Sequence, residues 1–76
     1  MGLTVGVIGL RHPHSAGHLR TLATLPEVAA VVVADESAEA RAAAGGHCPK
    51  VTAAVADAAA LLARPEVAVA VVALPT

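Results

Sequence analysis

Apolar residues gather in three short runs, separated by stretches in which apolar and polar positions mix. The runs Leu3–Ile8, Val28–Ala34 and Val67–Leu74 are rich in β-branched residues and predict strands. The second and third are continuously apolar, which is typical of strands buried on both faces of a parallel sheet. A further short strand is predicted at Lys50 and Val51.

Three helices are predicted between these strands, at Ser15–Leu25, at residues 38–44 and at Ala53–Ala63. Pro26 is expected to end the first helix, and the Gly45-Gly46 pair is expected to end the second. Ser37 and Thr52 are the expected N-caps of the second and third helices, because their hydroxyls can accept a hydrogen bond from the first turn.

The sequence also contains an internal repeat. Leu25–Asp35 resembles Arg64–Leu74 at an offset of 39 positions, as the Pro-Glu pairs beginning at Pro26 and Pro65 show. Each copy consists of the end of a helix, a turn and a buried strand. Strands that alternate with short helices predict an α/β fold, a Rossmann-like half domain with a parallel sheet of about four strands and helices on both faces.

Composition limits what a chain of 76 residues can be. Phe, Tyr and Trp are absent, so the core must be built from Val, Leu, Ile and Ala. A net charge of −1 without a basic patch argues against nucleic acid and anionic membranes as partners. The apolar runs are far shorter than the roughly 18–20 residues of a spanning helix, and no signal peptide is evident. The single Cys48 cannot form an internal disulfide, which favours a cytoplasmic location.

Three features are expected to meet at the carboxyl edge of the sheet, where parallel α/β folds bind ligands. Gly9 follows the first strand and lets the backbone approach a phosphate near the free N–H groups of the next helix. Asp35 follows the second strand, where a carboxylate can accept hydrogen bonds from ribose hydroxyls. Leu74 and Pro75 lie at the end of the last strand, where a turn can pass under a nicotinamide or flavin ring. Each residue also has a purely structural interpretation, as a turn, a cap or a strand end.

The order and spacing of these features resemble the N-terminal domain of the glucose–fructose oxidoreductase/inositol dehydrogenase (Gfo/Idh/MocA) family. The resemblance rests on the segments VGVIGL, HLRTLATLPEVAAVVVADESAEARAAA and DAAALLARPEVAVAVVALPT. It implies a Rossmann domain that binds NAD or NADP in an oxidoreductase acting on a sugar, cyclitol or related polyol. It also implies that residues 1–76 are the N-terminal part of the dinucleotide-binding domain. The substrate domain would then lie outside this chain, and we expect the full-length protein to be a homo-oligomer.

The loop after the first strand departs from the three-glycine pattern of that family. Gly9 matches the first family glycine, whereas Arg11 and Ser15 occupy the positions of the other two. We therefore expect Gly9 to form the turn, Gly9 and Leu10 to lie against the cofactor, and Arg11, His12 or Ser15 to contact the pyrophosphate through side chains. The alternative is a non-catalytic Rossmann-like domain that binds a regulatory or other ligand, which the missing glycines favour.

Acidic residues bear on the choice of cofactor. Asp35 and Glu36 favour NAD, because a carboxylate repels the 2′-phosphate of NADP. Arg41 is close enough in sequence to keep NADP possible. No residue of the chain is a convincing general base, so we assign no catalytic residue.

The histidines raise the question of a metal site. His12, His14 and His18 lie close together in sequence, but a transition metal needs three or four ligands of fitting geometry. His47 and Cys48 are expected at the opposite edge of the sheet. We therefore predict no metal site, with His14 and His18 capping and packing the first helix and His12 solvated.

Overall fold

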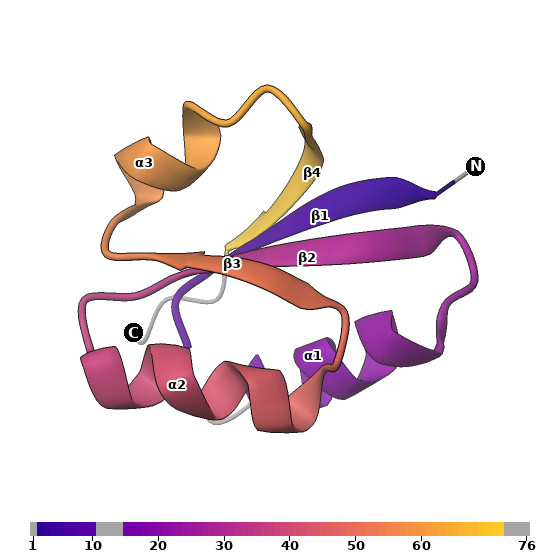
Figure 1. The fold of residues 1–76 in the computed structure, drawn as a ribbon, viewed down its shortest axis with the longest axis horizontal. Helices are drawn as coiled ribbons and strands as arrows, with labels where there is room; N and C mark the ends of the chain where they lie inside the picture. Colours follow the sequence, from indigo (N-terminus) through magenta and orange to yellow (C-terminus); the bar gives the residue numbers. More distant parts are fainter. Residues whose placement is uncertain (1, 11–14, 73–76) are drawn as a thin grey trace.

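The computed structural model describes residues 2–10 and 15–72 of the chain. Within them the elements are β1 (Leu3–Ile8), α1 (Ser15–Thr24), β2 (Val28–Ala34), α2 (Ala38–His47), β3 (Val51–Val55), α3 (Ala58–Leu62) and β4 (Val67–Val72). The strands form one sheet in the order β3-β2-β1-β4, and every neighbouring pair is parallel (Figure 1). The predicted α/β architecture, with its four-stranded parallel sheet, is therefore confirmed.

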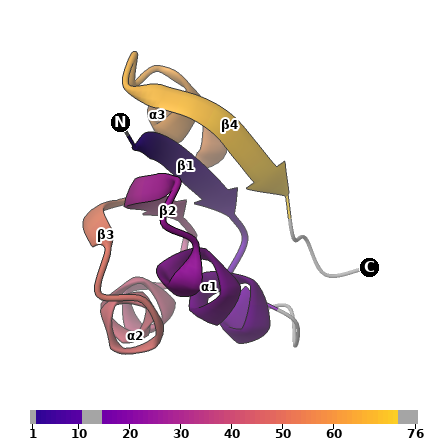
Figure 2. The same cartoon turned by 90° about the vertical axis from the view of Figure 1, so that its right-hand side faces the viewer.

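The helices divide between the two faces of the sheet, as Figures 1 and 2 show. α1 and α2 pack against one face, whereas α3 packs against the other. From β1 to β3 the chain steps in one direction across the sheet, and it then returns past β2 and β1 to reach β4. Because connections between parallel strands keep one hand, this reversal moves α3 to the opposite face. β1 and β4 therefore flank the topological switch point.

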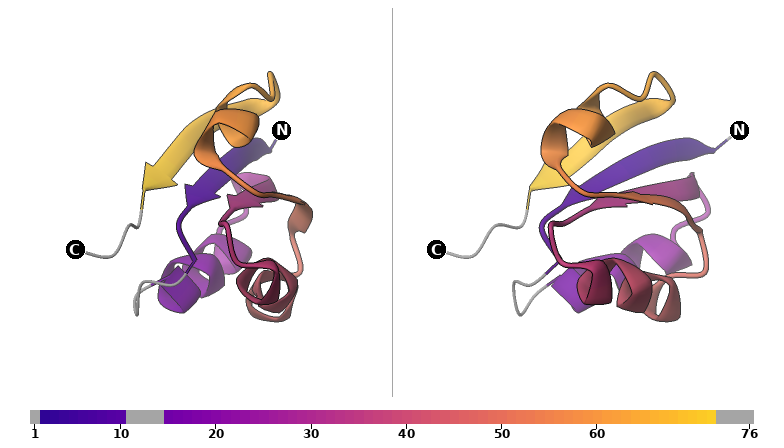
Figure 3. Two further views of the ribbon diagram at one scale, coloured as in Figure 1. Left: turned by 90° about the vertical axis from the view of Figure 1, so that its left-hand side faces the viewer. Right: turned by 60° about the vertical axis from the view of Figure 1, so that its left-hand side comes forward.

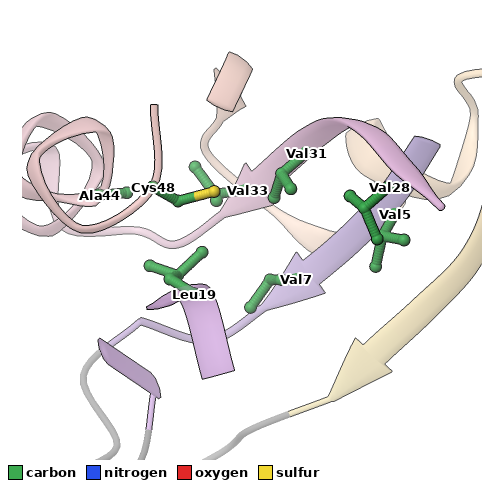
Figure 4. Packing of buried hydrophobic residues seen from close by; sticks show 8 residues of the cluster. All are labelled: Val5, Val7, Leu19, Val28, Val31, Val33, Ala44 and Cys48. Atoms are coloured by element: carbon green, nitrogen blue, oxygen red, sulfur yellow. The ribbon is translucent and has the colours of Figure 1, made fainter. Parts of the chain in front are cut away.

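Two hydrophobic clusters fill the space between the sheet and its helices. The larger one lies under α1 and α2 (Figure 4) and contains Val5, Val7, Leu19, Val28, Val31, Val33, Ala44 and Cys48. The smaller one lies under α3 and contains Ile8, Val32, Ala34 and Leu61. From Val31 to Ala34, successive residues of β2 alternate between the two clusters, because strand side chains point to opposite faces. The prediction that β2 is buried on both faces is thus confirmed for Val31–Ala34, whereas Ala29 is exposed.

The internal repeat corresponds to the same turn formed twice. The N–H of Val28 donates to the carbonyl oxygen of Leu25 at 3.1 Å, and the N–H of Val67 donates to that of Arg64 at 3.2 Å. In each copy a Pro-Glu pair fills the two positions between donor and acceptor. The turn leads from the end of a helix directly into a strand that pairs with β1.

The predicted end of the second helix is wrong. α2 continues through Gly45 and Gly46 to His47, and the N–H of Cys48 donates to the carbonyl oxygen of Ala44 at 3.0 Å. Ala44 and Cys48 are both buried in the larger cluster. Their burial outweighs the cost of about 1 kcal/mol that each helical glycine carries relative to alanine.

The predicted third helix is also wrong over half its length. Residues 51–55 form β3, which pairs in parallel with β2 from Val31 to Ala34, and the helix is confined to Ala58–Leu62. Its N-cap is Asp57 rather than Thr52, since the Asp57 carboxylate accepts a hydrogen bond from the Ala60 N–H at 2.7 Å. The exposed edge of β2 supplies hydrogen-bond partners that the alanine-rich sequence alone does not reveal.

The expectation that the last strand is buried on both faces is wrong within its described residues. Val69 and Val72 are 51% and 61% exposed. β4 is an edge strand, and the smaller cluster covers it near Val67. Among the described residues, no helix combines the length and the apolar character that crossing a bilayer requires.

Candidate functional site

The carboxyl ends of β1, β2 and β3 surround a cleft of about 180 Å³. Its lining consists of Ile8, Gly9, Ala34, Asp35, Glu36, Ala56, Asp57 and Ala58. Three of the residues predicted from the sequence, Gly9, Asp35 and Glu36, are therefore brought together. β1 and β4 end side by side at this edge, with Ile8 opposite Val72 (Figure 3). The cleft thus lies next to the topological switch point.

Gly9 turns the chain at the end of β1. Its φ of 91° lies in the left-handed region, which glycine adopts without a steric penalty and other residues adopt at a cost of about 1–2 kcal/mol. Its N–H donates to the carbonyl oxygen of Ala34 at 2.8 Å, so the turn is attached to the end of β2. The sequence prediction that Gly9 forms the turn is confirmed.

Asp35 connects the loops that follow β1, β2 and β3. The residue is buried, with 6% of its surface exposed. One carboxylate oxygen, Oδ2, accepts a hydrogen bond from the Leu10 N–H at 2.8 Å, and Oδ1 accepts one from the Ser37 N–H at 2.8 Å. The Asp35 N–H donates to the carbonyl oxygen of Val55 at 3.1 Å. Hydrogen bonds of this kind compensate the burial of a charge, so Asp35 has a structural role in shaping the cleft. Its contact with ribose hydroxyls stays a prediction.

Hydrogen bonds with residues of the first turn of α2 hold the turn between β2 and α2 in place. Ser37 is the N-cap, as predicted, and its Oγ accepts a hydrogen bond from the Ala40 N–H at 3.2 Å. Nη1 of Arg41 donates to the carbonyl oxygen of Asp35 at 2.6 Å and to that of Glu36 at 3.2 Å. The Glu36 residue itself is exposed at the rim of the cleft. Sequence reasoning considered Arg41 only as a ligand for a phosphate and missed these backbone contacts.

The wall formed by Ala56, Asp57 and Ala58 was also missed, because these residues fell inside the predicted third helix. The signal that could have located it is the aspartate itself, since Asp is a stronger N-cap than Thr. Asp57 joins Asp35 and Glu36 as the third acidic residue of the cleft lining, next to its alanines. Such a cleft suits an apolar, planar group flanked by hydroxyl or amine donors. Its volume is below the roughly 300–1,000 Å³ of a complete small-molecule site, so it fits only part of a larger ligand.

Leu10 and Ser15 are the described residues on either side of residues 11–14. The Leu10 side chain packs against the larger hydrophobic cluster, while its N–H binds Asp35. Ser15 is the first residue of α1, as predicted. The remaining predicted contacts lie outside the described residues, at Arg11, His12, Leu74 and Pro75. Their roles stay predictions.

Among the residues that the structure describes, no three His, Cys, Asp or Glu side chains are grouped as a metal site would require. Cys48 is a free, buried cysteine of the core. Comparisons of the chain with protein-family models, curated proteins and solved structures give no match. The geometry at the carboxyl edge of the sheet is therefore the basis for a functional assignment.

Proposed function

We propose that this chain is the nucleotide-binding part of an NAD- or NADP-dependent oxidoreductase. The cleft at the carboxyl edge holds the adenosine end of the dinucleotide, and the loop after β1 holds its pyrophosphate. The resemblance to the Gfo/Idh/MocA family supports this proposal and suggests a sugar, cyclitol or related polyol as the substrate. The chain alone is not catalytic, since we assign it no general base.

One arrangement carries the proposal. The positive-φ turn at Gly9 and the acidic end of β2 line the same cleft, beside the point where the strand order reverses. In doubly wound sheets this is the place where dinucleotides bind, with a glycine turn near the phosphates and an acid near the ribose. The strand order β3-β2-β1 is that of the first mononucleotide-binding half of that fold, and β4 stands where the second half begins.

The residues of the cleft fit the adenosine part of such a ligand chemically. Ala56 and Ala58 offer small apolar surfaces to a purine ring, and the exposed acidic residues Glu36 and Asp57 stand beside them as acceptors for hydroxyl groups. α1 begins at Ser15, and the N-terminal end of a helix favours an anion. NAD, when bound, supplies hydride transfer, whereas this chain's residues bind and orient its adenosine end.

The partners and the location follow from the same proposal. A further domain would bind the polyol substrate, and the full-length protein would assemble as a homo-oligomer. The cytoplasm, where NAD and NADP are abundant and thiols stay reduced, is the proposed location.

Calorimetric titration of the full chain with NADH and with ADP-ribose tests the proposal. We expect both ligands to bind, because both contain the adenosine diphosphate that the cleft and loop would hold. Ala56→Leu places a larger side chain in the cleft and should weaken both ligands by about tenfold or more. Ala59→Leu is the matched control, because Ala59 is exposed on α3 and does not line the cleft. A folded chain that binds neither ligand would contradict the proposal.

The second candidate is a non-catalytic Rossmann-like domain with a ligand-binding or regulatory role. The hydrogen bonds that Asp35 accepts from Leu10 and Ser37 favour it, because they show that this acid has a structural use of its own. The replacement of two family glycines by Arg11 and Ser15 favours it as well. A folded chain that binds AMP but neither NADH nor NADPH would support this candidate.

A further inference from the structure

Arg41 lies beside the cleft, and its guanidinium is directed at the backbone of the β2–α2 turn. Arg41 is the fourth residue of α2 and is half-buried. Its Nη1 donates to two successive carbonyl oxygens, those of Asp35 at 2.6 Å and Glu36 at 3.2 Å. Hydrogen bonds from a charged donor are stronger than those between neutral groups. The planar guanidinium is therefore anchored to the turn.

The same turn is held from its other side by the Asp35 carboxylate. Oδ1 accepts the Ser37 N–H at 2.8 Å, while the Asp35 N–H is bonded to Val55 of β3 at 3.1 Å. Glu36 stands between these two anchored residues, and it is exposed at the cleft rim. Its place at the rim depends on both anchors, because a turn with unpaired carbonyl oxygens could adopt other conformations.

We infer that Arg41 is a positioning residue that holds the β2–α2 turn, so that Glu36 faces the sugar end of the cleft. This inference rests on the proposed function and deepens it, because it selects between the two dinucleotides. Nη1 of Arg41 is bonded to the two carbonyl oxygens, so this donor orders the turn and is not available to a 2′-phosphate. Three acidic residues, Asp35, Glu36 and Asp57, line the cleft, and their negative charge repels a phosphate there. The ligand is thus NAD, whose ribose carries hydroxyls at both positions.

The experiment titrates the full chain with NADH and with NADPH by calorimetry. The variants are Arg41→Met, which keeps the length of the side chain without its charge, and Arg41→Lys, which restores a donor. Arg20→Met is the matched control, because Arg20 is exposed on α1 and its loss changes the net charge equally. Circular dichroism checks that each variant is folded.

We expect the unmodified chain to prefer NADH by about tenfold or more. Arg41→Met should weaken NADH several-fold and NADPH by no larger a factor, Arg41→Lys should recover part of the loss, and Arg20→Met should match the unmodified chain. Glu36→Gln should raise the affinity for NADPH relative to NADH, because it removes one repelling charge. If Arg41→Met lost affinity for NADPH while its affinity for NADH was unchanged, Arg41 would be a ligand of the 2′-phosphate, and the inference would be overturned.

Amide hydrogen exchange provides a readout that needs no cofactor. Arg41→Met should speed exchange at the Ser37 N–H more than Arg20→Met does, because the turn loses one of its two anchors. Equal exchange in the two variants would overturn the positioning role. If the folded chain binds neither cofactor, the proposed function and the cofactor preference both fall, while the exchange measurement still decides whether Arg41 holds the turn.

Discussion

Leu61 attaches α3 to the sheet, and replacing it with alanine measures how much of the fold depends on that contact. It is the buried residue of a five-residue helix and has 0% of its surface exposed. Its neighbours in the smaller cluster are Ile8, Val32 and Ala34. Because two of these are small, the cluster cannot easily collapse into the space that the leucine leaves.

The expected loss is large for a domain of this size. Buried Leu→Ala replacements cost about 2–5 kcal/mol, and we expect about 3 kcal/mol for Leu61→Ala. Domains are stable by about 0.05–0.15 kcal/mol per residue, so 76 residues correspond to roughly 4–11 kcal/mol. Leu62→Ala is the matched control, because Leu62 is the next residue of the same helix and is 62% exposed. It should cost less than about 1 kcal/mol.

Gly6 of β1 offers a second, sharper test of the same contact. A Cβ added at Gly6 would lie 2.6 Å from Cδ2 of Leu61 and 3.2 Å from Cγ1 of Val67. Gly6→Ala alone should therefore destabilise the fold by about 1–3 kcal/mol through overpacking. In the double variant, which combines Gly6→Ala with Leu61→Ala, the methyl group of the new alanine at position 6 occupies space that the Leu61 side chain has vacated. The combined loss should fall short of the sum of the single losses by about 1–3 kcal/mol.

Urea unfolding followed by far-ultraviolet circular dichroism measures these free energies, since the chain contains no Trp, Tyr or Phe to give a fluorescence signal. Equal losses for Leu61→Ala and Leu62→Ala would refute the packing of α3 on the sheet. Additive losses in the double variant would refute the close approach of Leu61 to the β1 backbone.

Three other properties can be checked independently. Asp35→Asn should lower the free energy of unfolding by about 1–3 kcal/mol in urea titrations, because one amide oxygen cannot replace two carboxylate oxygens as acceptors for Leu10 and Ser37. The pKa of Glu66 is lowered below 4.5, chiefly by a hydrogen bond from its own backbone N–H. Its contribution to stability should thus be complete above pH 4.5 and be lost as the pH falls through the lowered pKa, which an NMR titration of its carboxyl group would follow. The buried Cys48 thiol should react with a thiol reagent only at the rate of unfolding or opening, whereas fast reaction in the native state would place it outside the core.

The candidate site was only partly predictable from the sequence. Gly9 and Asp35 were identifiable, because each directly follows a strand with a clear apolar pattern and strand ends of a parallel sheet share one edge. The hydrogen bond that Asp35 accepts from the Leu10 N–H was not identifiable, since the two residues are 25 positions apart in sequence. Neither was the anchoring of Arg41, because a charged side chain can reach either a ligand or a backbone carbonyl from the same position on a helix.

By itself, the sequence determined the elements whose signals are local. Leu3–Ile8 and Val28–Ala34 are strands with the predicted bounds, because each segment is rich in β-branched residues and ends at a turn residue. Ser15 begins the first helix as predicted, and Ser37 caps the second. These features depend on backbone preferences and on hydrogen bonds within a few residues, so the local sequence alone determines them.

Only the tertiary structure decided the elements whose state depends on a distant partner. Residues 51–55 form a strand because the edge of β2 binds their backbone, although their alanines also suit a helix. α2 passes through two glycines because Ala44 and Cys48 are buried on the sheet. β4 is partly exposed because it lies at the sheet edge. In each case, pairing and burial between residues far apart in sequence outweigh local preferences of about 1 kcal/mol or less per residue.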